Sequence, residues 1–291
     1  MKLIVATCQF PIASDVGDNL RYIERQMREA KRRSAHLVHF PEGSLSGYAG
    51  REFASFAGYD WARLRTATEA VMTLAGEMGL WVVLGSSHPL SGAHKPHNSL
   101  YVIDARGRLV DRYDKMFCVG DARENTDDLK NYSSGDHFVT FRVRGVLCGL
   151  LICHDFRYPE LYREYKRRGV QLMLHSYHNG NSPQPEHGKR GNIWDYSVTA
   201  ASQAYAAANY LWISANNTSR RHSNWPSFWV RPDGRITGRL IQHRSGVLIS
   251  TLDPKETFFD ASQHWRSRAM RGIYHSGTLV RDARSRDRRK L

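Results

Sequence analysis

The strongest structural signal in the sequence is the stretch Val146–Leu161, V-L-C-G-L-L-I-C-H-D-F-R-Y-P-E-L. Its apolar first half predicts a buried strand, and Pro159 stands where the first turn of a helix accepts proline. Cys153 lies at the junction. We expect its thiol to feel the positive end of a helix, which lowers the pKa and favours a nucleophilic thiolate. The alternative for a single cysteine beside an apolar strand is a buried structural residue.

Strand-like and helical patterns alternate on both sides of this stretch, which indicates the α/β class. Apolar residues at helical spacing predict a helix through residues 20–30, capped by Asp18 or Asn19, and a second helix that Gly79 ends. Two hairpins are expected, one around residues 104–107 and one through residues 231–235 towards a strand at 247–249. Further strands are predicted at 2–9, 37–40, 80–85, 170–174 and 210–214, and a long helix at 193–208.

No break in composition marks a linker between domains. The sequence therefore predicts one domain, residues 1–277, followed by a basic C-terminal tail, residues 278–291. The polar stretches 114–136 and 176–191 are expected to be long loops, which line sites more often than they build cores.

Cysteine usage and the first residues favour a cytoplasmic protein. The four cysteines show no paired C-x-x-C spacing, so neither a zinc site nor a disulfide framework is indicated. The apolar run at residues 3–6 is too short for a signal peptide. No stretch reaches the length that crosses a bilayer, so no membrane association is expected.

The net charge is +14, which raises the question of nucleic acid or another polyanion as a partner. Residues 265–291 hold nine Lys and Arg residues and two Asp residues, so half of the excess lies at the C-terminus. Much of the remainder falls on a helix face within residues 21–33, where solvation explains it. This distribution argues against a dedicated surface for nucleic acid.

Three residues whose side chains could take part in catalysis each follow a strand-like segment. Glu42 follows the second strand in F-P-E-G, Lys115 follows the first hairpin in Y-D-K-M-F, and Cys153 follows the central strand. In an open α/β arrangement the ends of strands converge on a common crevice. Singly, Glu42 reads as a capping or surface acid and Lys115 as a surface cation. Together, and in this order, they form a recognisable set.

With this set the sequence resembles the nitrilase or carbon–nitrogen hydrolase superfamily, whose members share a Glu-Lys-Cys triad in that chain order. The resemblance runs from the first strand to about Gly277 and is most specific in the block Cys153–Glu160. It also includes A-T-C-Q at residues 6–9, Gly135-Asp136, and R-P-D-G at residues 231–234. It implies a one-domain αββα sandwich that assembles into αββααββα homodimers or larger oligomers, without a metal or an organic cofactor.

The chemistry of the three residues is consistent with that resemblance. Cys153 would attack a carbonyl or nitrile carbon, and Glu42 would take the thiol proton and return it to the departing ammonia or amine. Lys115, with a backbone N–H that follows Cys153, would stabilise the oxyanion. Water would then hydrolyse the thioester.

Two departures from the family pattern stand out. The pattern has a second active-site glutamate seven residues before the glycine that matches Gly135, and here that position is Asp128, with Glu124 four residues earlier. Either acid is a candidate for the role, and the alternative is that Asp127 and Asp128 are solvated loop acids. The second departure is Y-A-A-A-N at residues 205–209, where relatives show R-A-x-E-N.

Candidate substrate-binding residues surround the triad in the sequence. Arg157 matches an arginine that holds a substrate carboxylate in branches such as the ω-amidases, a task suited to a guanidinium; the alternative is an ion pair with Glu160 or Asp155. The loop after the strand at 170–174 supplies further candidates. The full set of substrate-binding candidates is Arg157, His154, Tyr48, His178, Asn179 and Trp194.

The sequence thus predicts a thiol amidohydrolase that cleaves a small linear amide or N-carbamoyl compound through a Cys153 thioester. The alternatives within the same chemistry are a nitrilase and an amide acyltransferase. An alternative of a different class is a non-catalytic member that binds polyanions through its basic tail.

Overall fold

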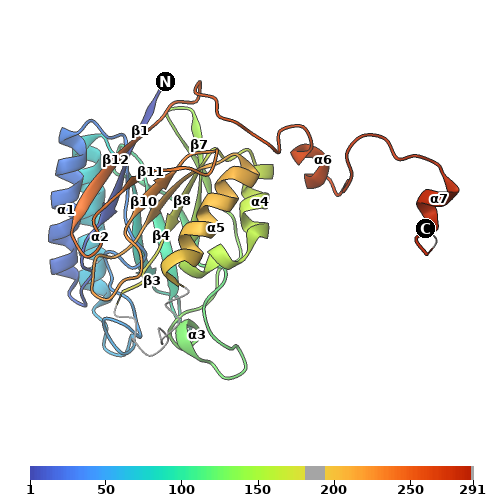
Figure 1. The fold of residues 1–291 in the computed structure, drawn as a ribbon. Coiled ribbons are helices and arrows are strands. Elements are labelled where there is room, and N and C mark those ends of the chain that lie inside the picture. Colours follow the sequence, from blue (N-terminus) through green and yellow to red (C-terminus); the bar gives the residue numbers. More distant parts are fainter. Residues whose placement is uncertain (181–193, 290–291) are drawn as a thin grey trace.

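The computed structural model describes residues 1–180 and 194–289, and these form two six-stranded sheets packed face to face between two layers of helices (Figure 1). The first sheet has the order β12-β1-β2-β3-β4-β5 and the second has the order β11-β10-β9-β8-β7-β6. The expected αββα sandwich is confirmed.

The first half of the chain supplies most of the first sheet and the helices that cover it. Its elements are β1 (Leu3–Gln9), α1 (Val16–Arg32), β2 (Leu37–His39), α2 (Trp61–Met78), β3 (Trp81–His88), β4 (His97–Ile103), β5 (Leu109–Asp114) and the short α3 (Asp127–Asn131). The central strands β1, β2 and β3 are parallel, and β4 and β5 extend the sheet antiparallel. Gly79 ends α2 with φ +62°, as predicted.

The second half repeats this arrangement around the Cys153 stretch. Its elements are β6 (Thr140–Val143), β7 (Val146–Ile152), the 3₁₀ turn η1 (Cys153–Arg157), α4 (Pro159–Arg167), β8 (Leu172–Ser176), α5 (Trp194–Asn209), β9 (Trp212–Asn216), β10 (Phe228–Val230), β11 (Ile236–Arg239), β12 (Gly246–Leu252), α6 (Arg266–Met270) and α7 (Ala283–Arg286). Here β7, β8 and β9 are the parallel strands.

Alternation along the strands explains the layers. On β1, Leu3 and Val5 face the second sheet, whereas Ala6 and Cys8 face α1 and α2. Both faces of the sheet are therefore apolar, as a sheet buried on both sides requires. The interior between the sheets also holds polar side chains. His39 contacts Ser214 through Nδ1 at 2.9 Å and Ser176 through Nε2 at 2.8 Å, so hydrogen bonds join the two sheets.

Three predicted details are wrong. The stretch 114–136, expected to be a loop, contains helix α3, and residues 181–191 of the other expected loop lie outside the described residues. Helix α1 begins earlier than expected, because Asp15 is its N-cap and accepts a hydrogen bond from the backbone N–H of Asp18 at 2.9 Å. The strand at 247–249 belongs to β12, which pairs with β1 in the first sheet and not with the hairpin of β10 and β11. Within the part of the chain that the structure describes, no helix is long and apolar enough to span a membrane.

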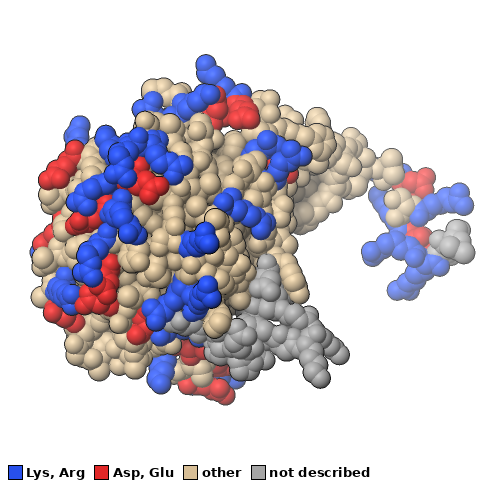
Figure 2. Space-filling model, turned by 60° about the vertical axis from the view of Figure 1, so that its left-hand side comes forward, with Lys and Arg blue, Asp and Glu red and all other residues tan. Residues whose placement is uncertain are grey.

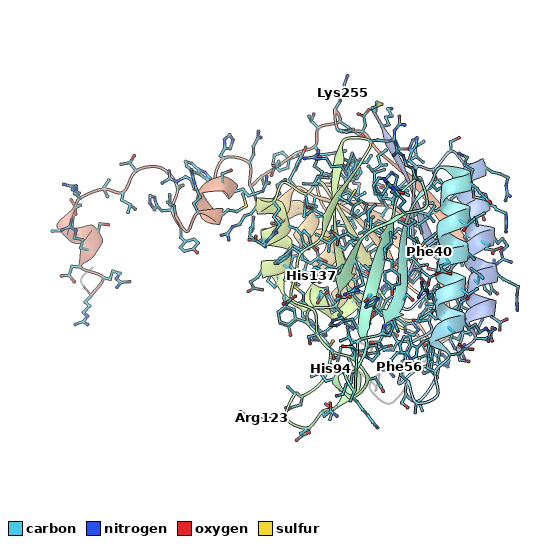
Figure 3. The ribbon with its side chains drawn as sticks, turned by 180° about the vertical axis from the view of Figure 1, so that it is seen from behind. Phe40, Phe56, His94, Arg123, His137 and Lys255 are labelled. Carbon is cyan, nitrogen blue, oxygen red and sulfur yellow. The ribbon has the colours of Figure 1, made fainter. Side chains whose placement is uncertain are left out.

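The segments that follow β2, β3 and β5 lie at one end of the molecule. Figure 3 shows Phe56, His94 and Arg123 of these segments at this end, and Lys255, which follows β12, at the opposite end. After β12 the chain leaves the sandwich as an extended arm that carries α6 and α7 (Figure 1).

Candidate active site

Glu42 follows β2 in a turn that packs directly on β3. A side chain at Gly85 of β3 would place its Cβ 2.0 Å from the carbonyl oxygen of Pro41, so only glycine allows this approach. Ser44 Oγ donates to the carbonyl of Gly85 at 3.0 Å and fixes the turn. As a result, the Glu42 side chain lies fully buried at the end of the sheet.

The two carboxylate oxygens of Glu42 have different surroundings. Oε1 accepts hydrogen bonds from Nδ2 of Asn98 at 2.7 Å and from Nζ of Lys115 at 3.0 Å. Oε2 is buried and has no hydrogen-bond partner among the described residues. One oxygen is therefore held in place, and the other is available as a proton acceptor.

Lys115 follows β5 and is buried with two carboxylates. Its Nζ lies 3.0 Å from Oε1 of Glu42 and 2.7 Å from Oδ2 of Asp128. Burial alone would lower the pKa of this lysine, but the carboxylates of Asp128 and Glu42 outweigh burial and raise the pKa well above its usual value. Lys115 is therefore a fixed ammonium group.

Asp128, in the first turn of α3, completes this charge cluster. Its carboxylate is buried, binds Lys115, and accepts hydrogen bonds from the Tyr48 hydroxyl and from the backbone N–H of Val119. These partners lower its pKa against the effect of burial. Glu124 is exposed. The alternative of a solvated loop acid is thus wrong for Asp128, and the structure does not bring Glu124 to the cluster.

Cys153 is the first residue of η1 and has φ +39°, a conformation that side chains rarely adopt. Asp155 holds the turn: its Oδ2 accepts from the backbone N–H of Ile152 at 2.9 Å and from the Tyr113 hydroxyl at 2.7 Å, and its Oδ1 accepts from the backbone N–H of Phe117 at 2.9 Å. One carboxylate therefore ties the turn of Cys153 to the segment that carries Lys115.

The expectation that a helix end lowers the thiol pKa is wrong. Burial and the Glu42 carboxylate raise the pKa of Cys153, while Lys115 and the backbone N–H of His178 act in the opposite direction. The physical reason is that α4 begins only at Pro159, and the five-residue turn η1 precedes it. The resting side chain of Cys153 is therefore a thiol beside a carboxylate.

These residues meet at a cavity of about 530 Å³. Its wall includes Cys153, Lys115 and Asp128, together with the candidates Tyr48, His154, His178 and Asn179. Glu42 is not among the described lining residues, and its Oε1 contacts Nζ of Lys115, which is one of them.

A comparison with known protein families shows to which family the chain with this site belongs. The family model described as carbon-nitrogen hydrolase matches residues 4–258. The chain belongs to the carbon–nitrogen hydrolase family. It is accordingly a hydrolase of carbon–nitrogen bonds other than peptide bonds, and the alternative of a non-catalytic member is not supported.

Similar proteins include proteins named as amidases and as a hydrolase. The omega-amidase NIT2 of Mus musculus is 30% identical over 260 residues, which cover 87% of this chain and 89% of that protein. The hydrolase Rv0480c of Mycobacterium tuberculosis is 26% identical over 209 residues, which cover 71% of this chain and 70% of that protein. An amidase of the nitrilase superfamily from Nesterenkonia AN1 has a TM-score of 0.74 at 21% identity, covering 93% of this chain and 96% of that one.

Two of the substrate-binding candidates are not among the described residues that line the cavity. Arg157 is exposed, its Cζ lies 4.8 Å from the ring centre of Phe156, and it is not among the described residues that line the cavity. Trp194 begins α5, but its side chain lies outside the described residues.

Several residues of the site were not predicted from the sequence. Asn98 supports Glu42, Asp155 supports Cys153, and Arg51, Val119 and Trp225 line the cavity. Asp155 lies within the quoted Cys153 stretch, so its position next to the nucleophile was a usable signal. The other residues come from separate loops and strands, and their spacing in the sequence carries no pattern.

Proposed function

We propose that the protein hydrolyses the C–N bond of a small linear amide or N-carbamoyl compound through a thioester on Cys153, releasing ammonia or an amine. The observation that supports this most is the buried pair of Glu42 and Lys115 beside Cys153, in which Oε2 of Glu42 has no partner among the described residues. An unpaired buried carboxylate oxygen costs free energy unless it binds a proton or a donor, which suits a general base.

The proposed reaction has two stages. In the first, Sγ of Cys153 attacks the carbonyl carbon while Glu42 takes the thiol proton, and Nζ of Lys115 donates a hydrogen bond to the new oxyanion. The C–N bond breaks as the carbonyl re-forms, and Glu42 gives its proton to the departing nitrogen. In the second, Glu42 takes a proton from water, the hydroxide attacks the thioester, and the C–S bond breaks to release the acid. Glu42 then returns the proton to sulfur.

Two further observations support a small amide as the substrate. The cavity of about 530 Å³ falls within the range of roughly 300–1,000 Å³ that is usual for small-molecule sites. The Nesterenkonia amidase has been solved in complex with butyramide and with the acetamide moiety of fluoroacetamide added covalently at its active-site cysteine.

Intact-mass spectrometry with fluoroacetamide, combined with ammonia release from a panel of amides and N-carbamoyl compounds, tests this proposal. We expect a covalent adduct and ammonia release in the wild type and neither in Cys153→Ala, because the thiol is the only nucleophile in the scheme. An undiminished rate of ammonia release in Cys153→Ala would show that another residue attacks the substrate.

The same experiment separates the alternatives that share this triad. A nitrilase would release ammonia from a nitrile faster than from the matching amide. An acyltransferase would form a hydroxamate with hydroxylamine at the expense of the free acid, because the amine intercepts the thioester.

We also propose that the protein forms a homodimer and works in the cytoplasm. The exposed apolar side chains of the C-terminal arm support the first, and four cysteines without disulfides support the second. Light scattering and cell fractionation test the two statements separately.

A further inference from the structure

Glu52 is a buried carboxylate that the proposed reaction does not use. It lies in the loop after β2, and its Oε2 is 3.1 Å from Nε2 of His178, in the loop after β8. The side chains are 0% exposed for Glu52 and 1% exposed for His178. The pair therefore joins two loops, one from each sheet, at the cavity that His178 lines.

His178 is connected in two ways to the residues of the proposed active site. Its ring stacks on Tyr48, with ring centroids 5.0 Å apart and an angle of 27° between the planes, and Tyr48 donates a hydrogen bond to Asp128. His178 and Cys153 line the same cavity, and the backbone N–H of His178 acts to lower the pKa of the Cys153 thiol. A displacement of His178 would therefore disturb both the support of Asp128 and a hydrogen-bond donor to the nucleophile.

The surrounding charges determine the protonation state of His178. Burial alone would lower the pKa of the imidazole, but the Glu52 carboxylate, with a contribution from Glu42, raises it above the ordinary value. The groups that face His178 are Glu52 and Tyr48 from the loop after β2, Glu42 at the end of β2, and Cys153 on η1. Without the Glu52 charge, burial would favour the neutral ring.

We infer that Glu52 is a positioning residue of this active site, which holds His178 as an imidazolium against Tyr48 and thereby keeps the backbone N–H of His178 on the sulfur of Cys153. The inference rests on the proposed function only in taking Cys153 as the nucleophile. The ion pair exists while the imidazole is protonated. Its contribution is present at lower pH and is lost as the pH rises through the raised pKa of His178.

The test is the pH profile of Cys153 alkylation by iodoacetamide, measured at Cys153 by peptide mass spectrometry. In Glu52→Gln, the weakened hydrogen bond to the thiolate should slow alkylation at neutral pH by about tenfold and move the profile up by about one pH unit. Glu52→Asp should restore part of the rate, because it keeps the carboxylate. The exposed Glu77 of α2 provides the matched control, since Glu77→Gln removes the same charge away from the site.

A double variant shows whether the pair acts as one unit. Glu52→Gln combined with His178→Asn should alkylate no more slowly than the slower single variant, because each single change already breaks the pair. Additive losses would overturn the inference. So would an alkylation profile in Glu52→Gln that matches the wild type while only the melting temperature falls, since that result means a purely structural role.

Two features keep this test decisive. If Glu52→Gln does not fold, His178→Asn carries the comparison, and an unmoved profile in that variant overturns the inference. Alkylation by iodoacetamide requires no turnover. Failure of the wild type to release ammonia from any amide would therefore contradict the proposed function and leave the alkylation comparison valid.

Discussion

Asp128 stands where the family pattern has glutamate, and the surrounding residues compensate for its shorter side chain. The first turn of α3 brings its backbone close to the cluster, and the Tyr48 hydroxyl and the backbone N–H of Val119 hold the carboxylate on Lys115. Tyr48 is itself 3.4 Å from Nζ of Lys115. The short acid and the phenol thus share the task of fixing the ammonium group.

We predict that Asp128→Asn lowers kcat by about 10²-fold, because it removes one of the two charges that fix Lys115 as an oxyanion-stabilising group. Steady-state kinetics on the best amide of the panel measure this effect. Glu124→Gln serves as the control and should leave kcat unchanged, since Glu124 is exposed on the same loop. Equal effects of the two substitutions would contradict the role of Asp128.

For individual residues, the sequence predicts which three form the triad, but it predicts less well which residues line the cavity. Glu42, Lys115 and Cys153 could be selected because each follows a strand, and the structure places all three at one end of the sandwich. Their catalytic roles stay predictions. Arg157 matches a carboxylate-binding arginine in the family resemblance, but η1 leaves it exposed. Arg51 comes to the cavity from a different loop.

Among the elements, η1 shows how a short turn can be controlled by one side chain. Asp155 accepts hydrogen bonds from β7, from the end of β5 and from the segment after Lys115. Burial nevertheless raises the pKa of this carboxyl group to about 6, and the hydrogen bonds only partly oppose it. The turn that carries the nucleophile therefore depends on a carboxyl group that is costly to ionise.

This raised pKa predicts a dependence of stability on pH. Between the unfolded value of 3.8 and the folded value of about 6, the folded state binds more protons at Asp155, so ionisation destabilises it as the pH rises. Relative to Asp155→Asn, the wild type should lose about 3 kcal/mol of unfolding free energy across this window and remain level above it. Urea unfolding of both proteins at several pH values measures the difference. A wild type that instead gains stability relative to Asp155→Asn as the pH rises would mean that hydrogen bonds to the carboxylate dominate.

The sequence predicts where individual helices and strands lie better than it predicts which strands pair. Periodicity located the longer strands and helices, because alternation and helical spacing are local properties, and it missed the short helices α3, α6 and α7. The pairing of β12 with β1 joins residues from opposite ends of the sandwich sequence, so no local pattern could show it. The start of α1 was misplaced by three residues or more, because Asp15, Asp18 and Asn19 are all acceptable caps and only the backbone selects Asp15.

For the molecule as a whole, the C-terminal arm is the part of the chain that lies outside the sandwich. It extends away from the sheets (Figure 1). Its large apolar side chains are exposed, among them Phe259 at 83%, Tyr274 at 86% and Leu279 at 68%. Exposed apolar side chains in such a segment favour burial against another surface. A second copy of the chain is the partner that the family resemblance implies.

We predict that the double variant Tyr274→Ser/Leu279→Ser weakens the dimer by about 10²-fold or more, because each large apolar side chain contributes roughly 1.5–3 kcal/mol when buried. Light scattering across a concentration series measures this shift. The circular dichroism spectrum should not change, since both side chains are exposed in the single chain. A wild-type protein that stays monomeric at all concentrations would refute the proposed dimer.

The charged residues are distributed as the sequence indicates, with mixed charges on the sandwich and basic residues on the C-terminal arm. Figure 2 shows Lys and Arg interspersed with Asp and Glu over the sandwich, and a group of basic side chains at the end of the arm. Ion pairs such as Arg28 with Glu24 and Arg33 with Glu29 follow the surface of α1. The interspersed acids explain why a net charge of +14 does not form one continuous basic surface on this face.

The division of the proposed catalytic residues between the two sheets has a consequence for folding. Glu42 and Lys115 follow strands of the first sheet, whereas Cys153 and His178 follow strands of the second. Neither sheet alone contains a base and a nucleophile, so a half-assembled chain cannot acquire activity step by step. During refolding, activity therefore cannot appear before the two sheets dock, and its appearance gives an upper limit for the time of docking.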